Sequence, residues 1–180
     1  MWWILGIVVL IVLYVVGVYN TLIKLRNKVS DQRSQIDVEL KRRFDLVPNL
    51  VETVKGYAKH EKSTLEDIIK ARNTYVSAGS LDDQLKADGE LTGALNKLFA
   101  LTESYPDLKA NTNFMSLQND LSSIEQKIVY ARQFYNDSVL KLNNKIEVIP
   151  SNIIASIFNF KKESFFEAAT EERKNVKVEF

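Results

Sequence analysis

Few residue combinations in this chain could support catalysis. The most suggestive begins at His60 and Glu61 and starts like the helix of a zinc protease, where two histidines four positions apart bind the metal. Position 64 is Thr64, however, and the sequence contains a single histidine. The run therefore cannot form that site. We expect His60 to lie near a helix surface and pair locally with Glu61 or water, with a pH-responsive role as the alternative.

Other signatures of chemistry are missing from the sequence. There is no cysteine, which excludes thiolate metal sites, cysteine nucleophiles and disulfides. No glycine-rich phosphate loop, nucleophile elbow or kinase signature occurs. The balance of 24 Lys and Arg against 23 Asp and Glu gives a net charge of +1, without the basic excess of a general nucleic-acid binder. We therefore expect no enzymatic activity, cofactor, small-molecule substrate or nucleic-acid partner.

The densest group of charges could instead bind a protein. Lys41, Arg42 and Arg43 are consecutive, and carboxylates stand four positions to either side of Lys41, at Asp37 and Asp45. Intrahelical pairs at this spacing explain the charges as a solvated helix face. The alternative is a partner-binding corner at a turn predicted at Pro48. Its candidate residues are Arg42, Arg43, Asp45, Asn49, His60 and Glu61.

An apolar N-terminal segment precedes these residues. Trp2–Ile23 contains no charged side chain and would span roughly 33 Å as a helix, enough for a hydrocarbon core of about 30 Å. Trp2, Trp3 and Tyr19 stand at its ends, as expected for membrane interfaces. A cleaved signal peptide fits less well, because the start has no basic residue and the apolar stretch is too long. We predict an uncleaved transmembrane anchor at 1–23.

Basic residues follow this anchor and none precedes it. Lys24, Arg26, Lys28 and Arg33 all lie on its C-terminal side. The positive-inside rule then predicts an N-terminus outside the cell and a cytoplasmic domain. We expect Lys24, Arg26 and Lys28 to contact lipid headgroups.

The rest of the chain reads as helices. From Leu22 onward, apolar residues recur at alternating steps of three and four, which is typical of a left-handed helical bundle. Pro48 and Pro106 predict breaks, Ser80 and Asn113 predict helix caps, and Pro150 follows the last long helix. Short turns predict antiparallel neighbours. The expected helices are 24–47, 49–78, 81–105 and 113–147, within a domain at 24–149.

Two features of the pattern leave alternatives open. Asn20 and Asn27 are seven positions apart, as are Asn136 and Asn143, and seam asparagines of this kind fix helix register. In the C-terminal segment at 150–180, the apolar run 153–160 could fold onto the bundle with Phe165 and Phe166, or meet lipid beside Lys161 and Lys162. The last residues, 176–180, read as a short extended tail.

Several motifs occur in a fixed order along the chain: Tyr19-Asn20-x-Leu22, Leu25-Arg26-Asn27, Ser34 to Arg43, Asp45 to Val51, Val54 to Ala58, His60-Glu61, Glu103 to Asn111, Ala131-Arg132, Tyr135-Asn136 and Pro150-Ser151-Asn152. Their order resembles that of the LemA family. This resemblance implies a bacterial single-pass membrane protein with a bromodomain-like up-and-down four-helix bundle, and it implies no reaction.

The sequence thus predicts an all-α, non-enzymatic membrane protein. Our first hypothesis is a scaffold or adaptor on the cytoplasmic face of a bacterial membrane, which holds an unknown protein partner or copies of itself. The alternative is a regulatory accessory of a membrane protease or an envelope-stress system. A hydrolase or lipid-modifying enzyme is disfavoured, because the sequence offers no paired catalytic groups.

Overall fold

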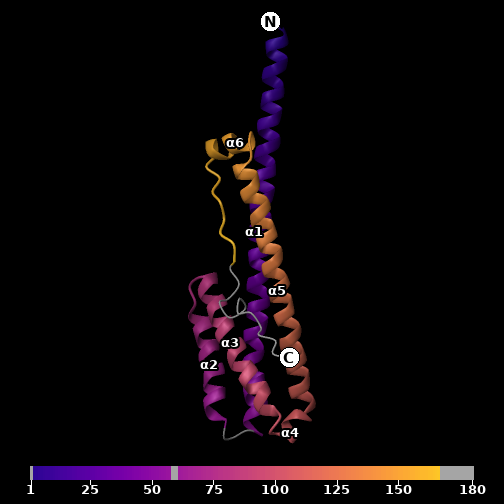
Figure 1. Ribbon diagram of the computed structural model, residues 1–180, viewed down its shortest axis with the longest axis vertical. Helices are drawn as coiled ribbons and strands as arrows, with labels where there is room; N and C mark the ends of the chain where they lie inside the picture. Colours follow the sequence, from indigo (N-terminus) through magenta and orange to yellow (C-terminus); the bar gives the residue numbers. More distant parts are fainter. Residues whose placement is uncertain (1, 58–60, 167–180) are drawn as a thin grey trace, which may run out of the picture. The chain divides into compact units, whose positions relative to one another are not determined.

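The computed structural model describes residues 2–57 and 61–166, and these residues form helices joined by turns and coil, with no strand among them (Figure 1). The predicted all-α class is confirmed. His60 and the tail at 176–180 lie outside the described residues. The helices are α1 (Trp2–Lys55), α2 (Lys62–Ser77), α3 (Leu81–Thr102), α4 (Pro106–Lys109), α5 (Thr112–Glu147) and α6 (Ser151–Ile157).

The chain divides into two compact units. Within the described residues, unit 1 contains 2–35 and 130–166, and unit 2 contains 36–57 and 61–129. Helices α1 and α5 therefore each contribute to both units. We describe each unit by itself.

Helix α1 does not end at Pro48, so the predicted break is wrong. A proline inside a helix removes one backbone hydrogen bond and crowds the preceding turn, at about 3 kcal/mol. Here the surrounding turns are packed in the core of unit 2, and that burial offsets the cost. The predicted helix 49–78 is consequently two elements, the end of α1 and the whole of α2. The buried apolar residues around the proline are Phe44, Val47, Leu50, Val51 and Val54.

One hydrophobic core fills unit 2, and every helix of the unit contributes to it. Phe44 of α1 stacks on Tyr75 of α2, with ring centroids 4.0 Å apart and planes at 8°. Phe99 of α3 meets Phe114 of α5 edge to face at 6.2 Å. Leu108 adds the single-turn helix α4 to the same core. This burial follows from the three-and-four spacing of the apolar residues.

Local side-chain chemistry sets the start of α3. The Ser80 Oγ accepts a hydrogen bond from the Asp83 backbone N–H at 3.2 Å, so the predicted cap is confirmed. A cap of this type stabilises a helix by about 1 kcal/mol. At its other end, α3 stops at Thr102, three residues before the predicted end, and Pro106 starts α4.

Helix α5 is capped by a different asparagine from the one predicted. The Asn111 Oδ1 accepts from the Phe114 backbone N–H at 3.0 Å, whereas Asn113 lies inside the helix. Two asparagines two positions apart both satisfy the sequence rule for a cap. Burial of Leu108 and Phe114 on either side of Asn111 selects the earlier one.

In unit 1, Asn136 and Asn143 of α5 hold the extended backbone that follows α6. The side-chain amide of Asn143 donates to the Glu163 carbonyl at 2.8 Å and accepts from the Glu163 N–H at 3.0 Å. Asn136 makes the same two bonds with Phe166, at 3.0 and 2.9 Å. The seven helical residues from Asn136 to Asn143 rise about 10.5 Å, which is close to the length of the three extended residues from Glu163 to Phe166. The two asparagines are therefore spaced to bind both ends of that stretch.

The predicted register role of the asparagines therefore needs correction. Asn136 and Asn143 bind a neighbouring backbone segment, which fixes the C-terminal segment on α5. Asn20 and Asn27 are exposed and occupy no packed seam. Packing of the C-terminal segment extends to Phe166, whose ring lies 4.4 Å from that of Tyr135.

Candidate functional site

The residues predicted to share a corner at Pro48 do not share one, as far as the structure describes them. Arg42, Arg43, Asp45 and Asn49 lie along α1 in unit 2, before the point where the chain leaves that helix. Glu61 stands directly before α2, and His60 lies outside the described residues. The predicted corner at Pro48 is wrong, because α1 continues to Lys55.

Three of these residues form an ordinary solvated helix face. Arg42 pairs with Glu39 at 3.0 Å, and Asp45 pairs with Lys41 at 2.6 Å. Asn49 is also exposed. The interpretation of this basic run as intrahelical pairs is confirmed for Lys41 and Asp45. Pairs of this kind are worth a few tenths of a kcal/mol, so they leave this face open to solvent and to other molecules.

Arg43 is buried, so it cannot belong to an exposed binding surface. Its Nη1 lies 2.6 Å from Asp88 Oδ1, and its Nη2 lies 3.5 Å from Glu125 Oε2. The Arg43 and Asp88 side chains are 2% and 5% exposed, whereas Glu125 is 45% exposed. Arg43 and Asp88 are removed from water, and each stays charged in the interior only because it is paired with the other.

A sequence signal for this buried pair existed. Asp88 comes seven positions after Leu81 and three before Leu91, at a spacing where apolar residues are expected. Arg43 comes three positions after Leu40 and four before Val47, at the same kind of position. A charge at a seam position in each of two helices indicates a buried ion pair. The same surroundings affect Tyr75: burial, followed by the nearby Asp37, Asp45 and Asp88 carboxylates, raises the pKa of its hydroxyl.

A second constellation lies where α1 ends and α2 begins. The Tyr105 hydroxyl donates to Glu61 Oε1 at 3.0 Å, and the Asn111 side-chain amide donates to the Tyr57 hydroxyl oxygen at 3.0 Å. The hydrogen bond to Glu61 holds the pKa of Tyr105 above its usual value. We call this group of four residues the turn surface; it links the end of α1 and the start of α2 to α4 and α5.

The turn surface is the structural counterpart of the predicted corner. Of the predicted residues described by the structure, it contains only Glu61. From sequence, Tyr57 and Asn111 are only members of the similar motifs, and Tyr105 is expected at the end of the third helix, so none of the three is predicted as a site residue. Tyr57 is exposed, and so is Asp107 on the adjacent α4. Polar side chains with an exposed aromatic ring are typical of surfaces that bind proteins.

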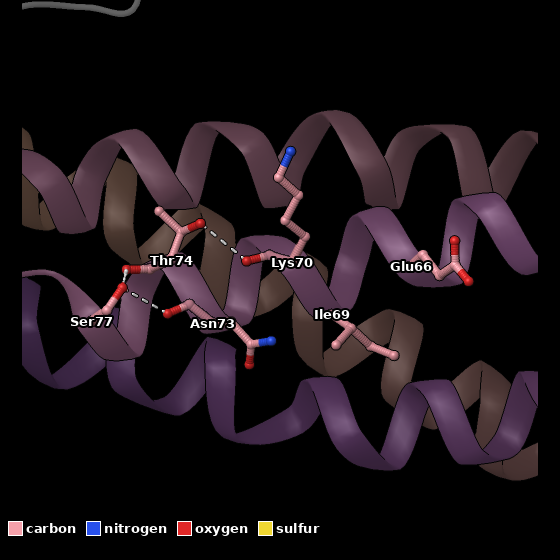
Figure 2. Close-up of a pocket in the computed structure, with 6 residues that line it drawn as sticks. All are labelled: Glu66, Ile69, Lys70, Asn73, Thr74 and Ser77. Atoms are coloured by element: carbon pink, nitrogen blue, oxygen red, sulfur yellow. Dashed lines mark hydrogen bonds between the residues drawn. The ribbon is translucent and has the colours of Figure 1, made fainter.

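Helix α2 also carries a shallow concavity of 430 Å³ (Figure 2). All of its lining residues come from α2, and in Figure 2 their side chains fan outward from the helix. The Thr74 hydroxyl donates to the Lys70 carbonyl at 3.1 Å and the Ser77 hydroxyl to the Asn73 carbonyl at 3.0 Å. Those hydroxyls are engaged by their own helix. Across the described residues, no group of three His, Cys, Asp or Glu side chains is placed to hold a metal ion.

The predicted headgroup-binding residues all lie on exposed positions of α1 in unit 1. Lys28 pairs with Asp31 at 3.0 Å, and that hydrogen bond lowers the pKa of Asp31. The Arg26 guanidinium carbon lies 5.5 Å from the centre of the Phe160 ring. Lys24 is exposed as well. In the described part of the chain, α1 is the one helix long and apolar enough to cross a membrane.

Comparisons with known proteins agree with the sequence motifs. A profile of the LemA family matches residues 32–180. The chain is 26% identical over 175 residues to magnetosome protein MamQ 2 of Paramagnetospirillum magneticum, with 83% of this chain and 64% of that protein covered. It is 28% identical over 165 residues to protein LemA of Metamycoplasma hominis, with 89% of this chain and 74% of that protein covered. The chain thus spans slightly less than two thirds of the length of the magnetosome protein.

Proposed function

Since the chain belongs to the LemA family, we propose that it is a non-enzymatic, membrane-anchored scaffold or adaptor on the cytoplasmic face of a bacterial membrane. In this proposal, 1–23 is the anchor, 24–149 is the helical domain and 150–180 is a C-terminal segment. The domain holds a protein partner, or a second copy of the chain, close to the membrane.

The continuity of α1 is the observation that carries this proposal. Its first turns expose apolar side chains, with Leu5, Leu10 and Leu13 all more than 60% exposed. Its last turns line the core of unit 2, from Phe44 to Val54. Exposed apolar area is unfavourable in water at roughly 25 cal/mol per Å², and lipid removes that penalty. One unbroken helix thus serves both as the lipid-facing element and as part of the domain core.

The proposed arrangement of the domain is an up-and-down, bromodomain-like four-helix bundle. Its four helices would be the end of α1, α2, α3 and the start of α5, which all contribute to one core. Three residues connect α2 to α3, and a short connection of this kind favours antiparallel neighbours. With α4 as a single turn between α3 and α5, the turn surface lies at one end of this domain.

Single-cysteine labelling tests the proposed orientation. The natural chain contains no cysteine, so each introduced thiol is the only one present. We expect Trp2→Cys to react with a membrane-impermeant maleimide in intact cells, and Asp107→Cys to react only after the cells are permeabilised. Asp82→Cys is a matched domain control, because it is also an exposed aspartate near a helix start. The reverse pattern would place the domain outside the cell.

A further inference from the structure

We propose that α6 is a second membrane contact, which dips an isoleucine face into the headgroup–acyl boundary of the leaflet next to Tyr19. The occupant of this face is the lipid of the same membrane that α1 crosses. The inference rests on the proposed membrane attachment of α1, and it adds a contact that the anchor alone does not require.

The exposed face of α6 is apolar. Within α6 (Ser151–Ile157), Ile153 and Ile157 are four positions apart and are 59% and 71% exposed; Ile149, in the turn before the helix, is 76% exposed. Residues at this spacing share one face of a helix. The opposite face, formed by Ser151, Ile154 and Ala155, is buried. Two large aliphatic side chains on the solvent side of a short helix, with a third exposed in the turn before it, form an apolar patch that suits a partner of apolar chemistry.

Aromatic contacts place the C-terminal end of α6 beside the end of the apolar segment. The Tyr19 ring lies 4.7 Å from the Phe158 ring and 5.9 Å from the Phe160 ring. Tyr19 marks the end of the anchor at which tyrosine and tryptophan favour the membrane interface. Figure 1 shows α6 crosswise to α1 at the end of α5; α6, Tyr19 and the end of α5 all belong to unit 1. A short helix lying across the anchor at this level is suited to the plane of the interface.

The orientation of α6 is held firmly at both of its ends. At its start, the buried Ser151 Oγ lies 2.7 Å and 2.8 Å from the carbonyl oxygens of Lys145 and Val148. At its end, Asn159 adopts a φ of 54°, while the Phe160 N–H donates to the Ala155 carbonyl at 2.9 Å. This is the hydrogen-bond pattern of a Schellman cap, which fixes the direction in which the chain leaves the helix.

Charge follows the apolar face in the order that a membrane interface favours. Lys161 and Lys162 come directly after Phe160, both are exposed, and Lys162 pairs with Glu147. Arg26 lies over the Phe160 ring, so a cation flanks the same aromatic group. Apolar side chains that point into lipid, backed by cations at headgroup level, are characteristic of interfacial helices.

Depth-dependent quenching of a fluorescent probe tests this inference on the full chain. An environment-sensitive dye is attached to a single cysteine at Ile157, with Ile153→Cys as a second position. The protein is reconstituted into vesicles of phosphatidylcholine and phosphatidylglycerol that carry nitroxides at shallow or deep acyl positions. Leu10→Cys reports the anchor, and Val76→Cys on α2 is the matched exposed apolar control, at 68% exposure.

We expect both α6 probes to shift their emission to shorter wavelengths and to lie about 5–10 Å inside the membrane boundary. Shallow nitroxides should quench them best, whereas deep nitroxides should quench Leu10 best and Val76 should stay in water. Water-like α6 probes beside a lipid-quenched Leu10 would overturn the inference and leave the anchor intact. A water-like Leu10 would instead overturn the proposed attachment. Shifted α6 emission without lipid quenching, dependent on protein concentration, would assign the face to a second copy and also overturn the inference.

Discussion

Asp88→Ala is expected to lower the free energy of unfolding by about 3–5 kcal/mol. The substitution leaves the Arg43 guanidinium inside the core without its closest counter-charge, which lies at 2.6 Å. Glu125 is nearly 1 Å farther away and is half exposed, so it cannot replace Asp88. Chemical unfolding of the full chain in detergent micelles, followed by the helical circular-dichroism signal, measures the change.

Two comparisons separate this effect from a general sensitivity of α3. Glu90→Ala removes an exposed carboxylate from the same helix and should change stability by no more than about 0.5 kcal/mol. The double variant Arg43→Met with Asp88→Ala removes both charges, so it should recover much of the loss. An Asp88→Ala variant as stable as Glu90→Ala would show that the pair contributes nothing to the fold.

The second large effect concerns the anchor. Arginine at both Leu10 and Leu13 should prevent stable membrane insertion, because each charge near the centre of a spanning helix costs about 2.5–3.5 kcal/mol. Leu10 and Leu13 are exposed and lie in the middle of the segment, so an arginine there would have no protein contact to offset this cost. Membrane fractionation after carbonate extraction should show the double variant leaving the membrane pellet.

Val38→Arg is the matched control for charge. It introduces the same side chain at an exposed apolar position of α1, outside the predicted anchor. This variant should remain in the membrane fraction like the natural chain. Retention of the Leu10 and Leu13 double variant would contradict a role for the segment as the membrane anchor.

Periodic and capping features of the chain were predictable from sequence because they depend on neighbouring residues. The all-α class follows from apolar spacing, and the start of α3 follows from Ser80. Pro48 shows the limit of such rules. Its local cost is real, but the burial of Val47 and Leu50 beside it is a tertiary effect that no local rule contains.

The candidate site was harder to predict because its contacts join distant parts of the sequence. Arg43 and Asp88 are 45 positions apart, as close in space as any pair on one helix. The Tyr57–Asn111 hydrogen bond joins residues 54 positions apart. They lie close together because α1 continues past Pro48 to the start of this contact. Local sequence rules therefore predict a turn at Pro48, whereas α1 continues past it to Lys55.

In-cell photocrosslinking from the turn surface tests the central claim that this chain holds a protein at the membrane. A photoreactive residue replaces Asp107, next to the turn surface on α4, and Asp82 at the start of α3 serves as the matched exposed aspartate. We expect a discrete protein adduct from position 107 that position 82 does not give. A self-adduct indicates a scaffold, and a membrane-protease adduct indicates the accessory role. The same adducts from both positions, or none from position 107, would contradict the account.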